Sequence, residues 1–71
     1  MDKIWVDFNN IGVDGVRLIC QGTLDDIKKN GIILKEGLRL IIWDEELLAE
    51  SIVKFSSNDN CWVAKIDKKN W

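Results

Sequence analysis

The chain contains no histidine, no proline and no tyrosine, and only two of its 71 residues are cysteines. Histidine is the commonest general base and the commonest zinc ligand, so its absence argues against both kinds of site. Cys20 and Cys61 are far apart in the sequence and form no zinc-binding CxxC pair. A disulfide between them is conceivable, because both lie on predicted strands, but a cytoplasmic address favours free thiols. We therefore expect a protein that is not an enzyme and that binds no metal or cofactor.

The chain also lacks a dominant sign of charge and a long apolar run. Ten basic and twelve acidic residues are interleaved along it, which leaves no basic patch for nucleic acid or anionic lipid. The apolar runs 32–34 and 40–43 are short and bounded by charged residues, so we expect no membrane span. Residues 1–4 carry no secretory signal, so we expect a cytoplasmic protein.

Five stretches of the chain have the β-branched, aromatic or alternating pattern that is typical of strands. Residues 4–8 and 16–21 alternate apolar with polar side chains, and the loop between them is rich in glycine and asparagine. They predict a hairpin with a longer loop. Residues 38–43, 47–55 and 61–66 follow one another across short polar breaks, which predicts an antiparallel meander.

A short helix is predicted between the second and third strands. Its signals are Thr23 as N-cap, Asp25 and Asp26 in the first turn, Lys28 and Lys29 in the last turn, and Gly31 at the end. Leu24 and Ile27 give it a narrow apolar stripe. A helix of about two turns is marginal in isolation, so we expect it to pack on the sheet.

Residues 44–55 fit a helix as well as a strand. As a helix, they would begin at Asp44 and place Leu47, Leu48, Ser51, Ile52 and Phe55 on one face. The tight break at 44–46 and the neighbouring strands favour the strand. We therefore predict a mainly β fold with one short helix, in which residues 1–71 form a single half-open small barrel of five or six strands.

Three segments, Glu-Gly-Leu-Arg-Leu at 36–40, Trp-Asp-Glu-Glu at 43–46 and Cys-Trp-Val-Ala-Lys-Ile-Asp at 61–67, resemble the three-strand end of SH3-like small β-barrels. The chain is also similar in character to short bacterial proteins, including cyanobacterial ones. The resemblance implies the barrel fold. It does not imply binding of proline-rich peptides, because the acidic, tyrosine-rich loop of peptide-binding SH3 domains is missing.

Apolar residues occupy both faces of the predicted sheet, whereas a sheet with one solvated face has polar residues there. The inward positions are Ile4, Val6, Phe8, Val16, Leu18, Cys20, Leu38, Leu40, Ile42, Ala49, Val53, Phe55, Trp62, Ala64 and Ile66, with Leu24, Ile27 and Leu34 at one end. The apolar outward positions are Trp5, Ile19, Ile41, Trp43, Leu48, Ile52 and Val63. Three explanations of these apolar outward residues are possible. The helix and the termini cover them, a second copy of the chain packs on them, or a different protein binds there.

Trp and Arg are the residue types that most often anchor interfaces. We therefore predict Trp5, Arg39, Ile41, Trp43 and Ile52 as contact residues of a small protein-interaction module that forms a homodimer. The alternative is a nucleic-acid-binding small β-barrel, suggested by four tryptophans and a basic aromatic tail at 68–71. The scattered charge argues against that alternative.

Overall fold

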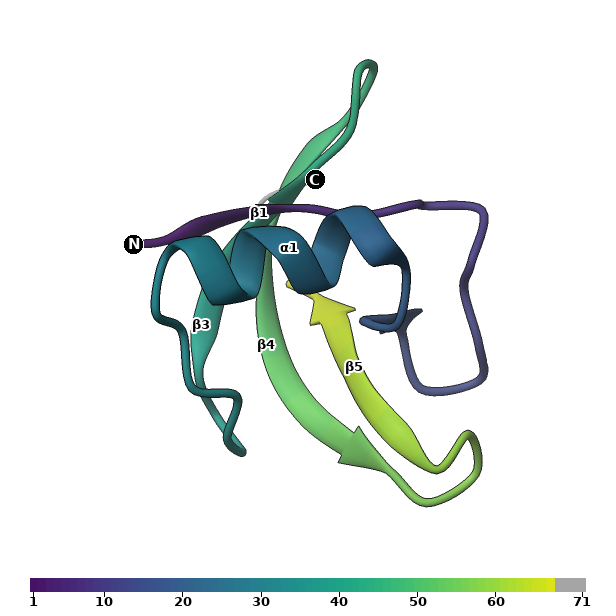
Figure 1. Ribbon diagram of the computed structural model, residues 1–71. Helices are drawn as coiled ribbons and strands as arrows, with labels where there is room; N and C mark the ends of the chain where they lie inside the picture. The colour runs from purple at the N-terminus through teal and green to yellow at the C-terminus, as the bar shows by residue number, and fades with distance from the viewer. Residues whose placement is uncertain (68–71) are drawn as a thin grey trace.

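The computed structural model describes residues 1–67. Its elements are β1 (Lys3–Trp5), β2 (Val16–Arg17), α1 (Gln21–Lys29), β3 (Arg39–Trp43), β4 (Leu48–Ser56) and β5 (Cys61–Ile66). The strands form one sheet in the order β1-β3-β4-β5-β2. The sheet curls into a half-barrel, and α1 lies across one end of its concave side (Figure 1). The predicted mainly β fold, with one short helix between the second and third strands, is confirmed.

The three central strands form the predicted antiparallel meander. β3 and β4 pair from Arg39–Ile52 at one end to Trp43–Leu48 at the other, and β4 continues along β5 for six residue pairs. The segment that fitted either a helix or a strand is therefore a strand. The β3–β4 hairpin projects beyond the body of the sheet (Figure 1).

The N-terminal strands do not form the predicted hairpin. β1 pairs in parallel with β3, and β2 pairs antiparallel with β5, so the two strands lie on opposite edges of the sheet. The meander has two edges, and each N-terminal strand satisfies the backbone groups of one of them. A hairpin between β1 and β2 would have left the meander unpaired on at least one side. The loop from β1 to β2 has instead only an isolated bridge between Ile11 and Val16.

The helix begins earlier than predicted. Its N-cap is Cys20, its first turn holds no acidic residue, and Thr23 is a wholly buried helical residue and not the cap. The start of the helix packs on β1, where a Cβ added to Gly22 would lie 2.9 Å from the Trp5 ring. Packing on the strand has therefore overridden the local capping signal. The predicted end is confirmed, since Gly31 has φ +64°.

The concave side of the half-barrel holds the hydrophobic core. Its buried members are Ile4, Val6, Val16, Leu18, Leu40, Ile42, Ala49, Val53 and Ala64, and Phe8, Ile27, Ile32, Leu34, Leu38, Trp62 and Ile66 pack against them. Three predicted core positions are more open. Cys20 is half-buried, and Leu24 and Phe55 are exposed. Phe55 lies on β4 beyond the last residue paired with β3, so no third strand covers it.

Candidate interaction surface

The strand register arranges the outer face of the sheet in rows that run across the strands. Trp5, Trp43 and Leu48 are consecutive partners on β1, β3 and β4, so their side chains share one row. The next row along the strands contains Lys3, Ile41 and Glu50, and the row after that contains Arg39, Ile52 and Lys65. All five predicted contact residues, Trp5, Arg39, Ile41, Trp43 and Ile52, therefore lie on this one face. We call the three rows the outer patch.

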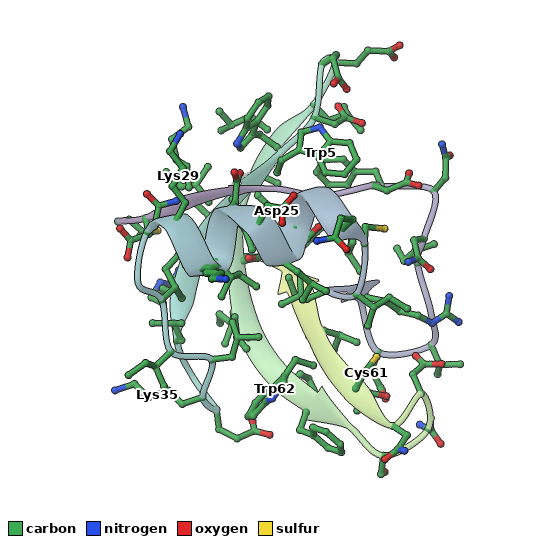
Figure 2. The ribbon with its side chains drawn as sticks, viewed as in Figure 1. Trp5, Asp25, Lys29, Lys35, Cys61 and Trp62 are labelled. Atoms are coloured by element: carbon green, nitrogen blue, oxygen red, sulfur yellow. The ribbon has the colours of Figure 1, made fainter. Side chains whose placement is uncertain are left out.

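Trp5 is held in place from two sides. Its ring packs on Gly22 of α1, where the missing Cβ leaves room for it. Its indole Nε1–H donates to Glu45 Oε1 over 3.3 Å, and its backbone N–H donates to Asp26 Oδ2 over 2.8 Å. Figure 2 shows Trp5 between α1 and the projecting β3–β4 hairpin. The helix therefore covers part of Trp5, and the indole stays half-buried at the border of the outer patch.

Of the other apolar side chains in the outer patch, Leu48 is the most accessible. Ile41, Trp43 and Ile52 are half-buried, and Leu48 is 59% exposed. Leu48 was not among the predicted contact residues, although the alternation along its strand had placed it on the outer face. Its position beside Trp43 in the same row makes it part of the surface.

Charged side chains border the outer patch on both ends. Arg39, whose side chain is 47% exposed, donates to Asp67 Oδ2 over 2.9 Å. Lys65 is exposed in the same row. At the opposite end, Glu45 and Glu46 are exposed in the β3–β4 turn. The outer patch thus has a basic border, in which Arg39 is paired with Asp67, and an acidic border. Between them lie the Trp43 row and the Ile41 row, and the Ile41 row also carries Lys3 and Glu50.

A polar network closes the part of the outer face beyond the basic border. The Asp14 carboxylate accepts hydrogen bonds from Ser56 Oγ and from Asn58 Nδ2. These bonds, Ser56 first, hold the pKa of Asp14 below its ordinary value of 3.8. Ser56 and Val63 alternate onto the outer face, and both are buried. The loop that carries Asp14 therefore shields this end of the sheet.

Arg17 forms hydrogen bonds both with the 9–15 loop and with the turn between β4 and β5. Its guanidinium donates to Asn10 Oδ1 over 3.0 Å and to Asp59 Oδ1 over 3.3 Å. A Cβ on Gly12 would lie 2.1 Å from Asp59 Oδ2, so only glycine leaves room for that carboxylate. This network was not predicted from the sequence, since its members are dispersed over fifty positions. The glycines of the 9–15 loop were its one visible signal.

Two observations on the described residues concern metal ligands and surface hollows. Within 1–67 no three His, Cys, Asp or Glu side chains converge as metal ligands. A shallow hollow of about 300 Å³ lies between the 11–15 loop and the end of β5, lined by Ile11, Gly12, Val13, Asp14, Gly15, Lys65 and Ile66. Its one carboxylate, Asp14, is already bonded to Ser56 and Asn58.

At nine residues and with a polar composition, the helix of the described chain does not reach across a bilayer.

The fold and the outer patch together define a small half-barrel with a partly apolar convex side. No family model matches the chain, and no curated protein or solved structure matches it either. The resemblance to SH3-like barrels therefore stays a prediction.

Proposed function

We propose that this protein is a non-enzymatic, cytoplasmic protein-interaction module that associates with a second copy of itself through the outer patch. One observation carries the proposal, namely that the register joins Trp5, Trp43 and Leu48 in a row, with Ile41 and Ile52 in the rows beside it. A contiguous apolar surface with a charged border is typical of protein-binding sites. Two of its members are tryptophans, which are enriched among the residues that dominate binding energy.

A second copy is the occupant that the charges favour. The outer patch has a basic border, formed by Lys65 and by Arg39 with its ion-pair partner Asp67, and an acidic border with Glu45 and Glu46. A strongly acidic or strongly basic partner would be repelled at one of these borders. A copy of the same surface presents both signs and can satisfy both.

The surface area of the chain can be compared with the area that a standard protein interface buries. A standard interface buries about 800 Å² on each partner, which would be about a sixth of the 4632 Å² surface of this chain. The outer patch occupies only part of one face. Because interfaces below the standard size are typical of transient complexes, we expect a reversible dimer.

Sedimentation equilibrium over the micromolar range tests this proposal. We expect the wild-type chain to dimerise and Trp43→Ala to raise the dimer Kd by at least about 30-fold, the effect of losing one typical hot-spot side chain, because the symmetric dimer loses two. Ile33→Ala is the matched control, because Ile33 is an 81% exposed apolar residue outside the outer patch. Its Kd should equal that of the wild type.

Two results would contradict the proposal. One is a wild-type chain that stays monomeric at high micromolar concentration. The other is a monomer that binds a single-stranded oligonucleotide at low salt with loss of tryptophan fluorescence, which would support the nucleic-acid alternative.

A further inference from the structure

The charges of the outer patch are ordered along the strands. The β3–β4 turn at one end carries Glu45 and Glu46. The Trp5 row and the Ile41 row follow, and the row of Arg39 and Lys65 closes the other end. Acidic and basic borders are thus separated along the strand direction by about six residues, about 20 Å at 3.3 Å per residue.

The acidic border is available to a partner. Asp44 Oδ1 accepts the backbone N–H groups of Glu46 and Leu47, so this carboxylate holds the turn together. The Glu45 carboxylate is anchored at the indole of Trp5, which keeps its charge beside the apolar row. Glu46 is exposed at the tip of the turn.

Two-fold symmetry allows two simple ways to bring two such faces together. When faces pack against each other, the two-fold axis lies in the plane of the interface, and each contact occurs twice. An axis along the strands would place Glu45 and Glu46 of one copy over the same residues of its partner. An axis across the strands makes the strands of the two copies antiparallel. It places Glu45 and Glu46 of one copy over Arg39 and Lys65 of the other.

We infer that the two copies pack with their strands antiparallel, about a two-fold axis that crosses the strands between the Ile41 and Trp43 rows. The inference rests on the proposed self-association and specifies its geometry. Each acidic border then faces the partner's basic border, and the Trp43 row of one copy faces the Ile41 row of the other. Repulsion between like charges disfavours the alternative axis.

Charge reversal tests this arrangement. The first variant is Glu45→Lys with Glu46→Lys, and the second is Arg39→Glu with Lys65→Glu. In a homodimer of either variant about the inferred axis, the two borders that face each other carry the same charge, and this happens at both ends of the interface. The dimer Kd of each variant should therefore rise more than about tenfold, and the increase should shrink at high salt. An equimolar mixture of the two should form a heterodimer, because both contacts then join opposite charges. The chain with all four substitutions should dimerise as the wild type does.

Lys28→Glu with Lys29→Glu is the matched control for the second variant, because it makes the same kind of charge change in the last turn of α1. Its dimer Kd should stay near the wild-type value. The other axis predicts a different result, since Glu45→Lys with Glu46→Lys would only exchange one like-charge contact for another and leave the Kd unchanged.

The two proposals fail in different ways. If the wild type dimerises and Trp43→Ala weakens it, but the first charge variant dimerises as tightly as the wild type, the inferred axis is wrong and the self-association stands. If the quadruple variant fails to dimerise while it remains folded by circular dichroism, the axis is also wrong. A monomeric wild type removes both proposals.

Discussion

At Gly15 the backbone adopts φ +149°, a conformation that L side chains rarely take. The residue also lies against β5, where an added Cβ would come within 2.6 Å of the Ala64 carbonyl oxygen. Backbone atoms of a paired strand cannot move aside without breaking the ladder. Gly15 is therefore required both by conformation and by the close approach of the loop to the sheet.

Comparing two glycines separates these effects. Gly37 also has a positive φ, +83°, but a Cβ there would meet nothing within 4 Å. We expect Gly37→Ala to lower the free energy of unfolding by about 1 kcal/mol through backbone strain alone. Gly15→Ala should cost about 3 kcal/mol or more, because a backbone clash adds to the strain. Urea denaturation measures both. Equal losses would mean that the approach of Gly15 to Ala64 is not a tight contact.

At the scale of elements, α1 completes the edge of the sheet. β1 has only β3 as a neighbouring strand, and the Trp5 N–H bonds instead to the Asp26 carboxylate over 2.8 Å. The helix thereby covers an edge that could otherwise pair with another chain. This role explains why Thr23 is buried and why the helix begins before the residue that resembles its cap.

Adjacent carboxylates on the helix give a matched test. Asp26→Ala should lower the free energy of unfolding by about 1–2 kcal/mol, because the partly buried Trp5 N–H loses its acceptor. Asp25→Ala should change it by less than about 0.5 kcal/mol, since Asp25 is exposed and, among residues 1–67, its carboxylate bonds only to Gln21 on the same helix. Chemical denaturation distinguishes the two. If Asp25→Ala cost as much as Asp26→Ala, the stabilisation would come from helix charge and not from the bond to β1.

At the scale of the whole molecule, both sides of the sheet carry apolar residues, but different parts of the chain pack on each side. The concave side is filled by the core and by α1, and Trp62 lies on that side, away from Trp5 (Figure 2). The convex side is closed at one end by the Asp14 network and carries the outer patch at the other. The assignment of each tryptophan to a side therefore predicts whether its loss affects folding or association.

Trp62→Ala should lower the free energy of unfolding by about 3 kcal/mol, the lower end for large aromatic truncations, since Trp62 is only partly buried. It also loses the edge-to-face contact with Phe55, whose ring centroid is 5.5 Å away. Trp43→Ala should cost less in the monomer, because Trp43 lies on the outer face and, unlike Trp62, is not among the described residues that pack against the core. Urea denaturation at low micromolar concentration makes the comparison. If Trp43→Ala unfolded the protein and Trp62→Ala did not, the two sides would be inverted.

Prediction from sequence worked where a pattern is local. Alternation placed Ile4, Val16, Leu40 and Val53 in the core, and the short turn at Asp44 identified a strand where a helix was also possible. It failed where partners are remote. The N-terminal hairpin was wrong, because which strands pair at an edge depends on the closure of the whole half-barrel and not on the two segments themselves.

The same division holds for the candidate site. The sequence by itself determined that two sides of the sheet are apolar and which residues occupy each, because side chains alternate strictly along a strand. Only the tertiary structure decided that Trp5 joins Trp43 and Leu48 in one row, that α1 covers one edge, and that a loop shields Val63. Those outcomes depend on the register between segments far apart in the chain, and a local pattern carries no information about that register.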